Sequence, residues 1–326
     1  MDSAPDPADE FRNWLVLPRN VTVSILLRLG AIEILKSAQM VCSPWHSLCK
    51  DPSMWRAIDM RNSGNHLEFP NFQKMCRHAV DRSCGHLVDI NVEYFGTDDL
   101  LRHIADSSSQ LKRLRLVHCN DISDEGLSQA AAKLELLEEL AISYCPFSKE
   151  ALKAVGRCCP LLKSLKFNSR VQRNGDYDGE ALTIAENMSE LLRLQLFGNL
   201  LTNDGLQAIL DGCPRLESLD LRRCFNLILA GDLGRRCSEQ IKGLRLPHDS
   251  IDDYEFNDCC SFVNVSGGFS DIEHANVSGG SKFFDFSYIN YYDEDCHDYD
   301  HNYDDDYDDG HIDIEYFEAY DDPNND

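Results

Sequence analysis

The chain has 326 residues, of which 43% are hydrophobic and 27% charged, so we expect one large folded domain or two smaller ones. Its 31 basic and 56 acidic residues leave a net charge of −25, which argues against a nucleic-acid partner. The acidic start MDSAPDPADE and the lack of any run of about 18 apolar residues argue against a secretory signal and a membrane span. We therefore expect a protein of the nucleus, the cytoplasm or both.

The first predicted element is a group of two or three short helices within residues 17–49. Leu17-Pro18 opens the group, and apolar residues recur at helical spacing at Val21, Ile25, Leu26, Leu29, Ile34, Leu35, Val41, Trp45 and Leu48. A segment of about 40 residues cannot bury enough surface to fold alone. Its apolar face therefore needs a partner, which is either the rest of this chain or another protein.

Residues 55–250 repeat the pattern apolar-x-x-apolar-x-apolar. Its copies begin at Leu87, Leu111, Leu137, Leu162, Leu191, Leu216 and Ile241, at steps of 24–29 residues. This period is typical of leucine-rich repeats, in which each copy contributes one strand and one helical or turn segment. The similar stretch that starts at Trp55 could be an irregular first copy. We predict an α/β solenoid.

Other residues keep the phase of these repeats. Ser123, Ser148 and Thr202 precede acidic residues and helical runs, so we predict them to be helix N-caps. We predict that six cysteines of this region are free thiols with packing or turn roles. They are Cys84, Cys119, Cys145, Cys159, Cys213 and Cys224. No C-x2-4-C pair of a zinc site occurs, so neither a metal nor a cofactor is predicted.

Within each predicted strand, apolar side chains face the solenoid interior and the intervening side chains line its concave face. The intervening residues predicted to bind a partner protein are Arg113, Arg115, Lys166, Arg193, Phe197 and Arg222. Their basic groups suit an acidic or phosphorylated partner, and an aromatic such as Phe197 has no structural role on an open face. Two alternatives stay open: a solvated face of mixed charge, and contacts from the longer loop around Arg173 to Asp178.

From about residue 252 the repeats stop and acidic residues dominate. Residues 252–326 hold 23 acidic residues and one basic residue, Lys282, which gives a charge of −22. Low hydrophobicity and high charge predict a disordered solubilising or interaction tail, and the glycine and glutamate spacing of an EF-hand calcium loop is missing. Because the tail follows the last basic strand, we expect it to fold back on the concave arginines and compete with acidic partners.

The segment before the repeats resembles the F-box motif. The matching residues are Leu17-Pro18, Ile25-Leu26, Leu29, Ile34, Val41-Cys42, Trp45 and Asp51-Pro52-Ser53-Met54-Trp55. Asn20, Gly30-Ala31 and Pro44 depart from the usual pattern, and Pro44 is compatible with a helix only in its first turn. Together with the cysteine-containing repeats, residues 13–250 resemble the small plant F-box/LRR-repeat proteins.

The resemblance implies that the F-box binds the Skp-type adaptor of an SCF ubiquitin ligase, and through it the cullin and RING proteins, while the repeats hold the protein to be ubiquitinated. The implied adaptor-binding residues are Leu17, Pro18, Val21, Ile25, Leu26, Leu29, Ile34, Val41, Cys42 and Trp45. The implied division is a disordered N-terminus at 1–13, an F-box at 14–55, about seven repeats at 56–250 and a disordered acidic tail at 251–326. The chain would then be a receptor and not an enzyme.

Other classes of function fit the sequence less well. An acidic-tailed leucine-rich scaffold or chaperone for basic proteins such as histones is the alternative, although the F-box-like segment argues against it as the whole function. An enzyme is disfavoured because the 11 histidines, the cysteines and the carboxylates form no nucleophile–base or metal motif. A small-molecule receptor is disfavoured because about seven repeats make a shallow arc without an enclosed pocket.

Overall fold

The computed structural model describes residues 17–61, 69–168 and 177–255. All of them belong to one compact unit, Met1–Phe262, and a second unit, Val263–Asp326, lies outside the described residues. The predicted disordered N-terminus at 1–13 and residues 256–326 of the predicted tail also lie outside them. No helix in the described part is long and apolar enough to cross a membrane.

Residues 17–55 form three short α-helices and two 3-10 turns, in agreement with their apolar spacing. Their bounds are α1 (Arg19–Leu26), α2 (Ala31–Lys36), η3 (Ala38–Met40), α3 (Ser43–Cys49) and η4 (Pro52–Trp55). Gly30 separates α1 from α2 with a φ of 83°, a left-handed conformation that glycine adopts readily. Pro44 stands in the first turn of α3, where the missing N–H leaves no helical hydrogen bond unmade.

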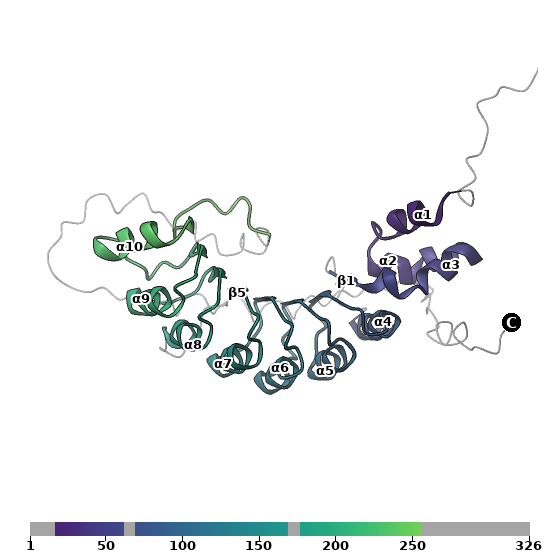
Figure 1. Cartoon of the computed structure of the whole chain (residues 1–326), viewed down its shortest axis with the longest axis horizontal. Coiled ribbons are helices and arrows are strands. Elements are labelled where there is room, and N and C mark those ends of the chain that lie inside the picture. The colour runs from purple at the N-terminus through teal and green to yellow at the C-terminus, as the bar shows by residue number, and fades with distance from the viewer. Residues whose placement is uncertain (1–16, 62–68, 169–176, 256–326) are drawn as a thin grey trace, which may run out of the picture. The chain divides into compact units, whose positions relative to one another are not determined.

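The repeats form one parallel sheet, in which eight strands of the described chain lie side by side in sequence order (Figure 1). The strands are β1 (Ala57–Met60), β2 (Asp89–Glu93), β3 (Arg113–Val117), β4 (Glu139–Ser143), β5 (Ser164–Asn168), β6 (Arg193–Gln195), β7 (Ser218–Asp220) and β8 (Gly243–Arg245). Each of the seven predicted repeats supplies one of β2 to β8. The irregular copy from Trp55 supplies β1, which pairs in parallel with β2.

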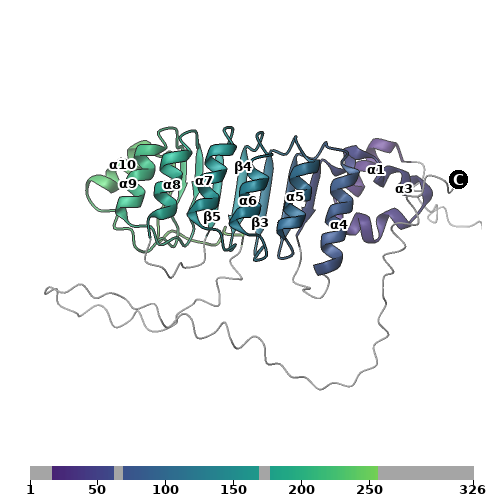
Figure 2. The ribbon, with the colours of Figure 1, turned by 90° about the horizontal axis from the view of Figure 1, so that it is seen from below.

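Helices line the outer side of the arc, one behind each interval between strands (Figures 1 and 2). They are α4 (Phe69–Arg82), α5 (Asp98–Ser107), α6 (Asp124–Ala131), α7 (Lys149–Cys158), α8 (Gly179–Asn187), α9 (Asn203–Gly212) and α10 (Asp232–Gln240). The leading leucines of the repeats, such as Leu111 and Leu137, are buried between the sheet and these helices. Ser123, Ser148 and Thr202 cap α6, α7 and α9 by accepting from backbone N–H groups, as predicted.

Aspartates in the first turn or at the cap of one helix also bind the cap of the next. Asp124 accepts hydrogen bonds from both the N–H and the hydroxyl of Ser148, at 2.9 and 2.5 Å. Asp98 contacts Ser123 in the same way, and Asp178 contacts Thr202. These carboxylates lie at the positive ends of helices, so they stabilise their own repeat and join it to its neighbour.

The cysteines of the repeats are packing residues. Cys119, Cys145 and Cys224 are buried, and their thiols donate to the carbonyls of Val92, Leu116 and Leu196 in the preceding repeat. Burial raises the pKa of Cys224 to about 12, so its thiol stays protonated. The cysteines of the described ranges are free thiols, and Cys84 is exposed.

The short helices of residues 17–55 and the repeats share one continuous hydrophobic core. Trp55, buried at their junction, donates from its indole N–H to the Cys49 carbonyl at 2.8 Å. The guanidinium of Arg82, from α4, lies 5.7 Å from the Trp55 ring and donates to the Gln39 side chain at 2.9 Å. The short helices therefore fold against the solenoid, which supplies the partner that their apolar face needs.

Candidate binding surfaces

The helices of the F-box-like segment, residues 17–55 and here named the F-box helices, leave several apolar side chains uncovered. Of the predicted adaptor-binding residues, Pro18, Val21, Leu29 and Val41 are exposed, and Val41 has 62% of its surface accessible. The half-buried members of the predicted set are Leu17, Ile25, Cys42 and Trp45. Transfer of an exposed apolar side chain such as Val41 from water into a protein interface is favourable. Several such residues together therefore indicate a surface that binds another protein.

Two residues of the predicted adaptor-binding set belong to the core instead. Leu26 and Ile34 are buried in the shared hydrophobic core, so neither can touch a partner. The sequence spacing identified them as apolar but could not tell the inward from the outward side of helices this short. Conversely, Leu27 and Met40 are exposed beside the predicted surface and were missed. Met40 ends the single turn η3, where no helical period marks the outward side.

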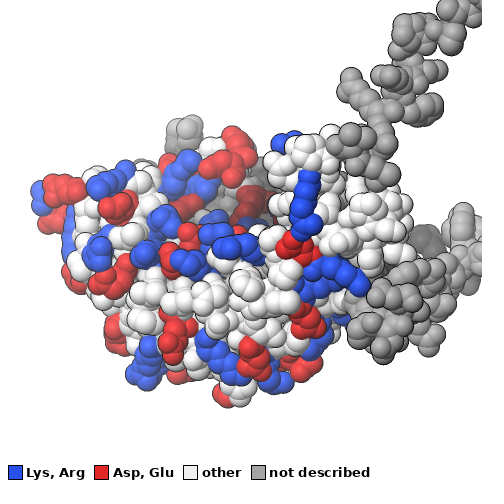
Figure 3. Space-filling view, turned by 45° about the vertical axis from the view of Figure 1, so that its right-hand side comes forward, with Lys and Arg blue, Asp and Glu red and all other residues white. Residues whose placement is uncertain are grey.

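On the concave face, Arg113 and Arg193 are exposed and paired with acidic residues of other repeats. Arg113 donates to Asp89 at 2.8 Å, and Arg193 donates to Glu139 at 3.1 Å. On the face that Figure 3 shows, basic and acidic side chains are intermingled. Exposed pairs of this kind contribute little individually, so these two arginines do not join the site described next.

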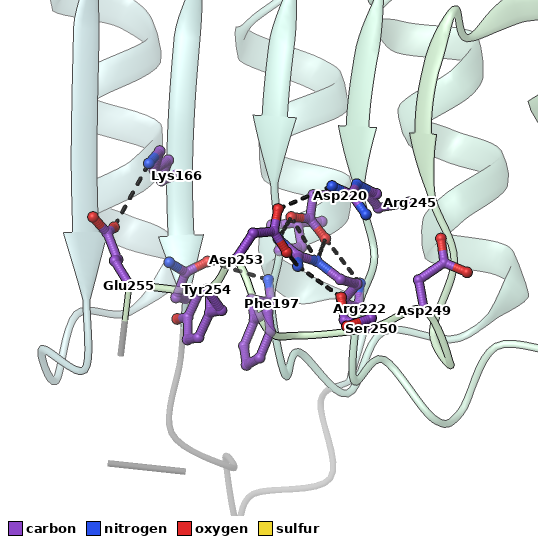
Figure 4. Close-up of polar contacts among 12 residues, drawn as sticks. Lys166, Phe197, Asp220, Arg222, Arg245, Asp249, Ser250, Asp253, Tyr254 and Glu255 are labelled. Atoms are coloured by element: carbon purple, nitrogen blue, oxygen red, sulfur yellow. Dashed lines mark hydrogen bonds and ion pairs between the residues drawn. The ribbon is translucent and has the colours of Figure 1, made fainter. Parts of the chain in front are cut away.

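Phe197 and Arg222 were predicted to be open to a partner, and the structure corrects this. Phe197 has 3% of its surface exposed and Arg222 has 5%. Both follow the carboxyl ends of their strands, and both are covered by residues 246–255, here named the return segment. It runs from β8 back across the concave face (Figure 4). Its last residues, 251–255, had been assigned to the disordered tail.

The return segment contacts four of the six predicted substrate-binding residues. The Tyr254 ring stacks on Phe197 with centroids 3.6 Å apart and planes 3° apart. Asp253 accepts from Arg222 at 2.5 Å and from Arg245 at 2.9 Å. Glu255 accepts from Arg115 at 2.7 Å and lies 3.6 Å from the ammonium of Lys166. The segment therefore brings together side chains that the sequence spreads over five repeats.

Arg222 is the charged centre of this site. Its guanidinium donates to Asp220 at 2.8–3.2 Å and to the Ser250 carbonyl at 3.0 Å. The hydrogen bond with Asp220 is the largest cause that raises the pKa of Arg222, and the contact with Asp253 adds to it. In return, the hydrogen bond from Arg222 holds the pKa of Asp253 below its usual range. Arg222 and Asp253 are therefore both charged throughout the neutral range.

An aromatic ladder borders the same edge of the sheet. Tyr94, His118 and Tyr144 occupy one position in successive repeats, each directly after a strand and each with positive φ. Their rings stack at centroid separations of 4.9 and 4.8 Å. The Tyr144 hydroxyl lies 3.1 Å from that of Tyr254, so the ladder ends against the return segment. The ladder was missed, although the repeat period would have placed these residues in line.

Comparisons with known proteins agree with this architecture. A family model described as F-box-like matches residues 14–61, and another described as Leucine Rich repeat matches residues 107–129. "F-box protein SKIP19" of Arabidopsis thaliana is 50% identical over 295 residues, which cover 86% of this chain and 95% of that protein.

Two further Arabidopsis thaliana relatives carry the repeats in their names. "Putative F-box/LRR-repeat protein 22" is 45% identical over 281 residues, covering 85% of this chain and 90% of the relative. "Putative F-box/LRR-repeat protein 23" is 56% identical over 260 residues, which are 77% of this chain but 58% of that longer relative. The chain belongs to the F-box/LRR-repeat proteins.

Proposed function

We propose that the chain is the substrate-recognition subunit of an SCF-type (cullin-RING) E3 ubiquitin ligase. Its F-box binds a Skp-type adaptor, which connects it to the cullin and the RING protein, and its repeats bind the protein to be ubiquitinated. The chain performs no chemistry itself. It acts by raising the effective concentration of substrate lysines beside the charged ubiquitin-conjugating enzyme, in the nucleus, the cytoplasm or both.

The exposed apolar surface of the F-box helices carries this proposal. Val21, Leu29 and Val41 lie on the side of the short helices that does not pack on the repeats. Full burial of one such side chain contributes about 1.5–3 kcal/mol, so a few of them suffice for a specific complex. Because the opposite side of the helices is fixed to the solenoid through Trp55, an adaptor bound here holds the repeats at a defined distance.

The concave face of the repeats supports the second half of the proposal. Its strands present polar and charged side chains in register, a surface that suits recognition of an extended or acidic protein segment. The side chains of Arg115 and Lys166 remain partly exposed to solvent even with the return segment in place. We propose that the captured protein is bound there.

Replacing Leu17 and Pro18 together by Ala tests the adaptor half. We expect the double variant to lose co-purification with the Skp-type adaptor while the thermal unfolding of the repeats stays unchanged. A matched control is Leu161→Ala with Leu182→Ala, two exposed leucines of the repeats, which should keep the adaptor. Undiminished adaptor binding by the Leu17/Pro18 variant would show that these two residues do not belong to the adaptor-binding surface.

The charge of the tail favours a second candidate function. Residues 252–326 carry a charge of −22, which suits a scaffold or chaperone that binds basic proteins such as histones. Histone capture by the full chain should then persist in the Leu17/Pro18 variant and disappear when the tail is deleted. Adaptor-dependent capture of other proteins would favour the ligase function instead.

A further inference from the structure

The return segment covers a site that the repeats build from one repeated position. In four successive repeats, the sixth residue after the leading apolar residue is buried on the concave side. These residues are Ser143, Asn168, Phe197 and Arg222. Asn168 links two of the neighbours, because its side chain donates to the Ser143 hydroxyl at 3.0 Å and accepts from the Phe197 N–H at 3.2 Å. The floor is therefore a connected row with an aromatic ring beside a guanidinium.

Three consecutive residues of the return segment occupy three parts of this site. Tyr254 is buried, and the Arg222 guanidinium lies 5.9 Å from the Phe197 ring and 6.0 Å from the Tyr254 ring. Asp253 and Glu255, on either side, keep 55% and 36% of their side-chain surface exposed. The order is acid, tyrosine, acid. Each acid reaches a pair of basic residues, and the ring lies flat on Phe197 (Figure 4).

The chemistry of the floor determines what can take the place of this tripeptide. Without it, Arg222 would keep Asp220 but lose Asp253, and the Phe197 ring would face water. An incoming group must therefore supply a carboxylate to Arg222 and a flat ring to Phe197. Arg115, which also lies 3.7 Å from Glu93, and Lys166 favour a second carboxylate next to the ring. Exchange is favoured because the ion pairs of the tripeptide are partly exposed and screened by salt.

We propose that this site binds a short acid–tyrosine–acid segment of the captured protein, and that Asp253–Glu255 occupies it in the free chain as an intramolecular competitor. The inference rests on the proposed function, in which the concave face holds the substrate. The inference restricts the class of substrates from acidic proteins in general to proteins with this tripeptide in an extended segment. Capture then requires the return segment to leave.

The site selects the unmodified tyrosine. The Tyr254 hydroxyl lies 3.1 Å from the Tyr144 hydroxyl, so a phosphoryl group on this oxygen would collide with the end of the aromatic ladder. Phosphorylation of this tyrosine therefore acts against binding, so of the acidic or phosphorylated partners expected from the sequence this site fits the acidic ones.

The acidic sequence after the return segment repeats the same tripeptide. Asp298-Tyr299-Asp300 and Asp306-Tyr307-Asp308 both follow the order acid, tyrosine, acid. They lie outside the described residues, and they belong to the same chain as the docked copy. A binding experiment must therefore remove these copies together with the docked one.

The test uses the full chain in complex with the Skp-type adaptor and a fluorescent peptide of residues 249–257, DSIDDYEFN. Two opened variants carry Tyr299→Ala and Tyr307→Ala together with either Tyr254→Ala or the pair Asp253→Asn and Glu255→Gln. We expect both to bind the peptide at least about tenfold more tightly than the unaltered chain, because a tethered competitor is removed. Peptides with Tyr→Ala, with phosphotyrosine, or with scrambled order should bind at least about tenfold more weakly than DSIDDYEFN.

Each result decides the question. If both opened variants keep the adaptor and unfold like the unaltered chain but do not bind the peptide, the site proposal is wrong and the proposed function stands. Equal binding of the scrambled peptide also overturns the proposal. If the peptide binds but the adaptor does not, the proposed ligase function is the one that fails.

If the opened variants do not fold, the proposal can be tested by hydrogen exchange of the unaltered chain. Saturating peptide should then speed amide exchange in residues 250–255, and unchanged exchange overturns the proposal.

Discussion

The two proposed binding surfaces of this molecule differ in whether the chain itself covers them. The F-box helices present an apolar surface that the described chain leaves open around Val21 and Val41, whereas the concave face is a charged and aromatic site that its own return segment fills. An adaptor common to many receptors can be met by a surface that is always available. A buried guanidinium such as Arg222, in contrast, needs carboxylate partners: Asp220 of its own repeat is one of them, and the occupant of the site supplies the second.

Removing the indole at the junction of the two regions should give the largest change in stability. Trp55→Ala takes away a fully buried ring and its hydrogen bond to Cys49, so we expect a loss of roughly 3–5 kcal/mol in the unfolding free energy. Denaturant unfolding of the full chain measures it. The exposed Leu182→Ala is the control and should change the free energy by less than about 0.5 kcal/mol.

The same variant tests whether the two regions depend on each other. Adaptor binding should fall in Trp55→Ala, because the open surface is held in shape by the junction, while peptide binding on the concave face between β3 and β8 should persist. If adaptor binding and peptide binding are lost equally, the two regions fold as one cooperative unit and cannot be perturbed separately.

A smaller effect is expected from one link between neighbouring repeats. Asp124→Ala removes two hydrogen bonds to Ser148, the cap of the next helix, at a cost of about 1–2 kcal/mol by thermal or denaturant unfolding. Glu125→Ala is the matched control, because Glu125 also lies in the first turn of α6 but its side chain bonds Gln129 in the same helix. If both variants lose the same stability, the interaction with the helix dipole explains the effect and the link between repeats does not.

The smallest effect concerns the pH dependence of the docked return segment. The pKa of Asp253 is lowered by Arg222, so its contribution is present above the unfolded pKa of about 3.9 and is lost as the pH falls through the lowered folded value. The pKa of Arg222 is raised, so this group stays charged. Hydrogen exchange of residues 250–255 should therefore be constant between pH 5 and 8 after correction for intrinsic rates, and should quicken only below about pH 4. A transition near pH 6.5 would indicate that a histidine controls docking.

The sequence predicted the framework of the molecule better than its sites. Seven strands, three helix caps and the positions of the buried cysteines followed from the repeat phase, because each depends on residues within one period or its neighbour. The F-box helices were also predictable from apolar spacing. The inward position of Leu26 and Ile34 was not, since it depends on how helices of six to eight residues pack into the shared core.

The concave site depends on contacts between residues far apart in the sequence. Phe197 and Arg222 were correctly assigned to the concave side, but composition assigned Tyr254 to a disordered acidic tail because most of its neighbours are acidic or polar. A single aromatic ring between two acids is too small a signal to change such an average. It becomes decisive only when the strand register brings a matching ring and matching basic groups into one row.

The return segment also acts on the mechanics of the solenoid. Through Asp253 and Glu255 it connects Arg245 on β8 with Arg115 on β3, strands that are otherwise linked only through the chain of neighbours between them. The segment crosses the inner, concave side of the curved stack of repeats and is bonded at both ends. A decrease in the curvature of the stack would therefore break these end contacts. Release of the segment therefore softens the curvature of β3 to β8, and any ligand that bridges the same ends restores the stiffness.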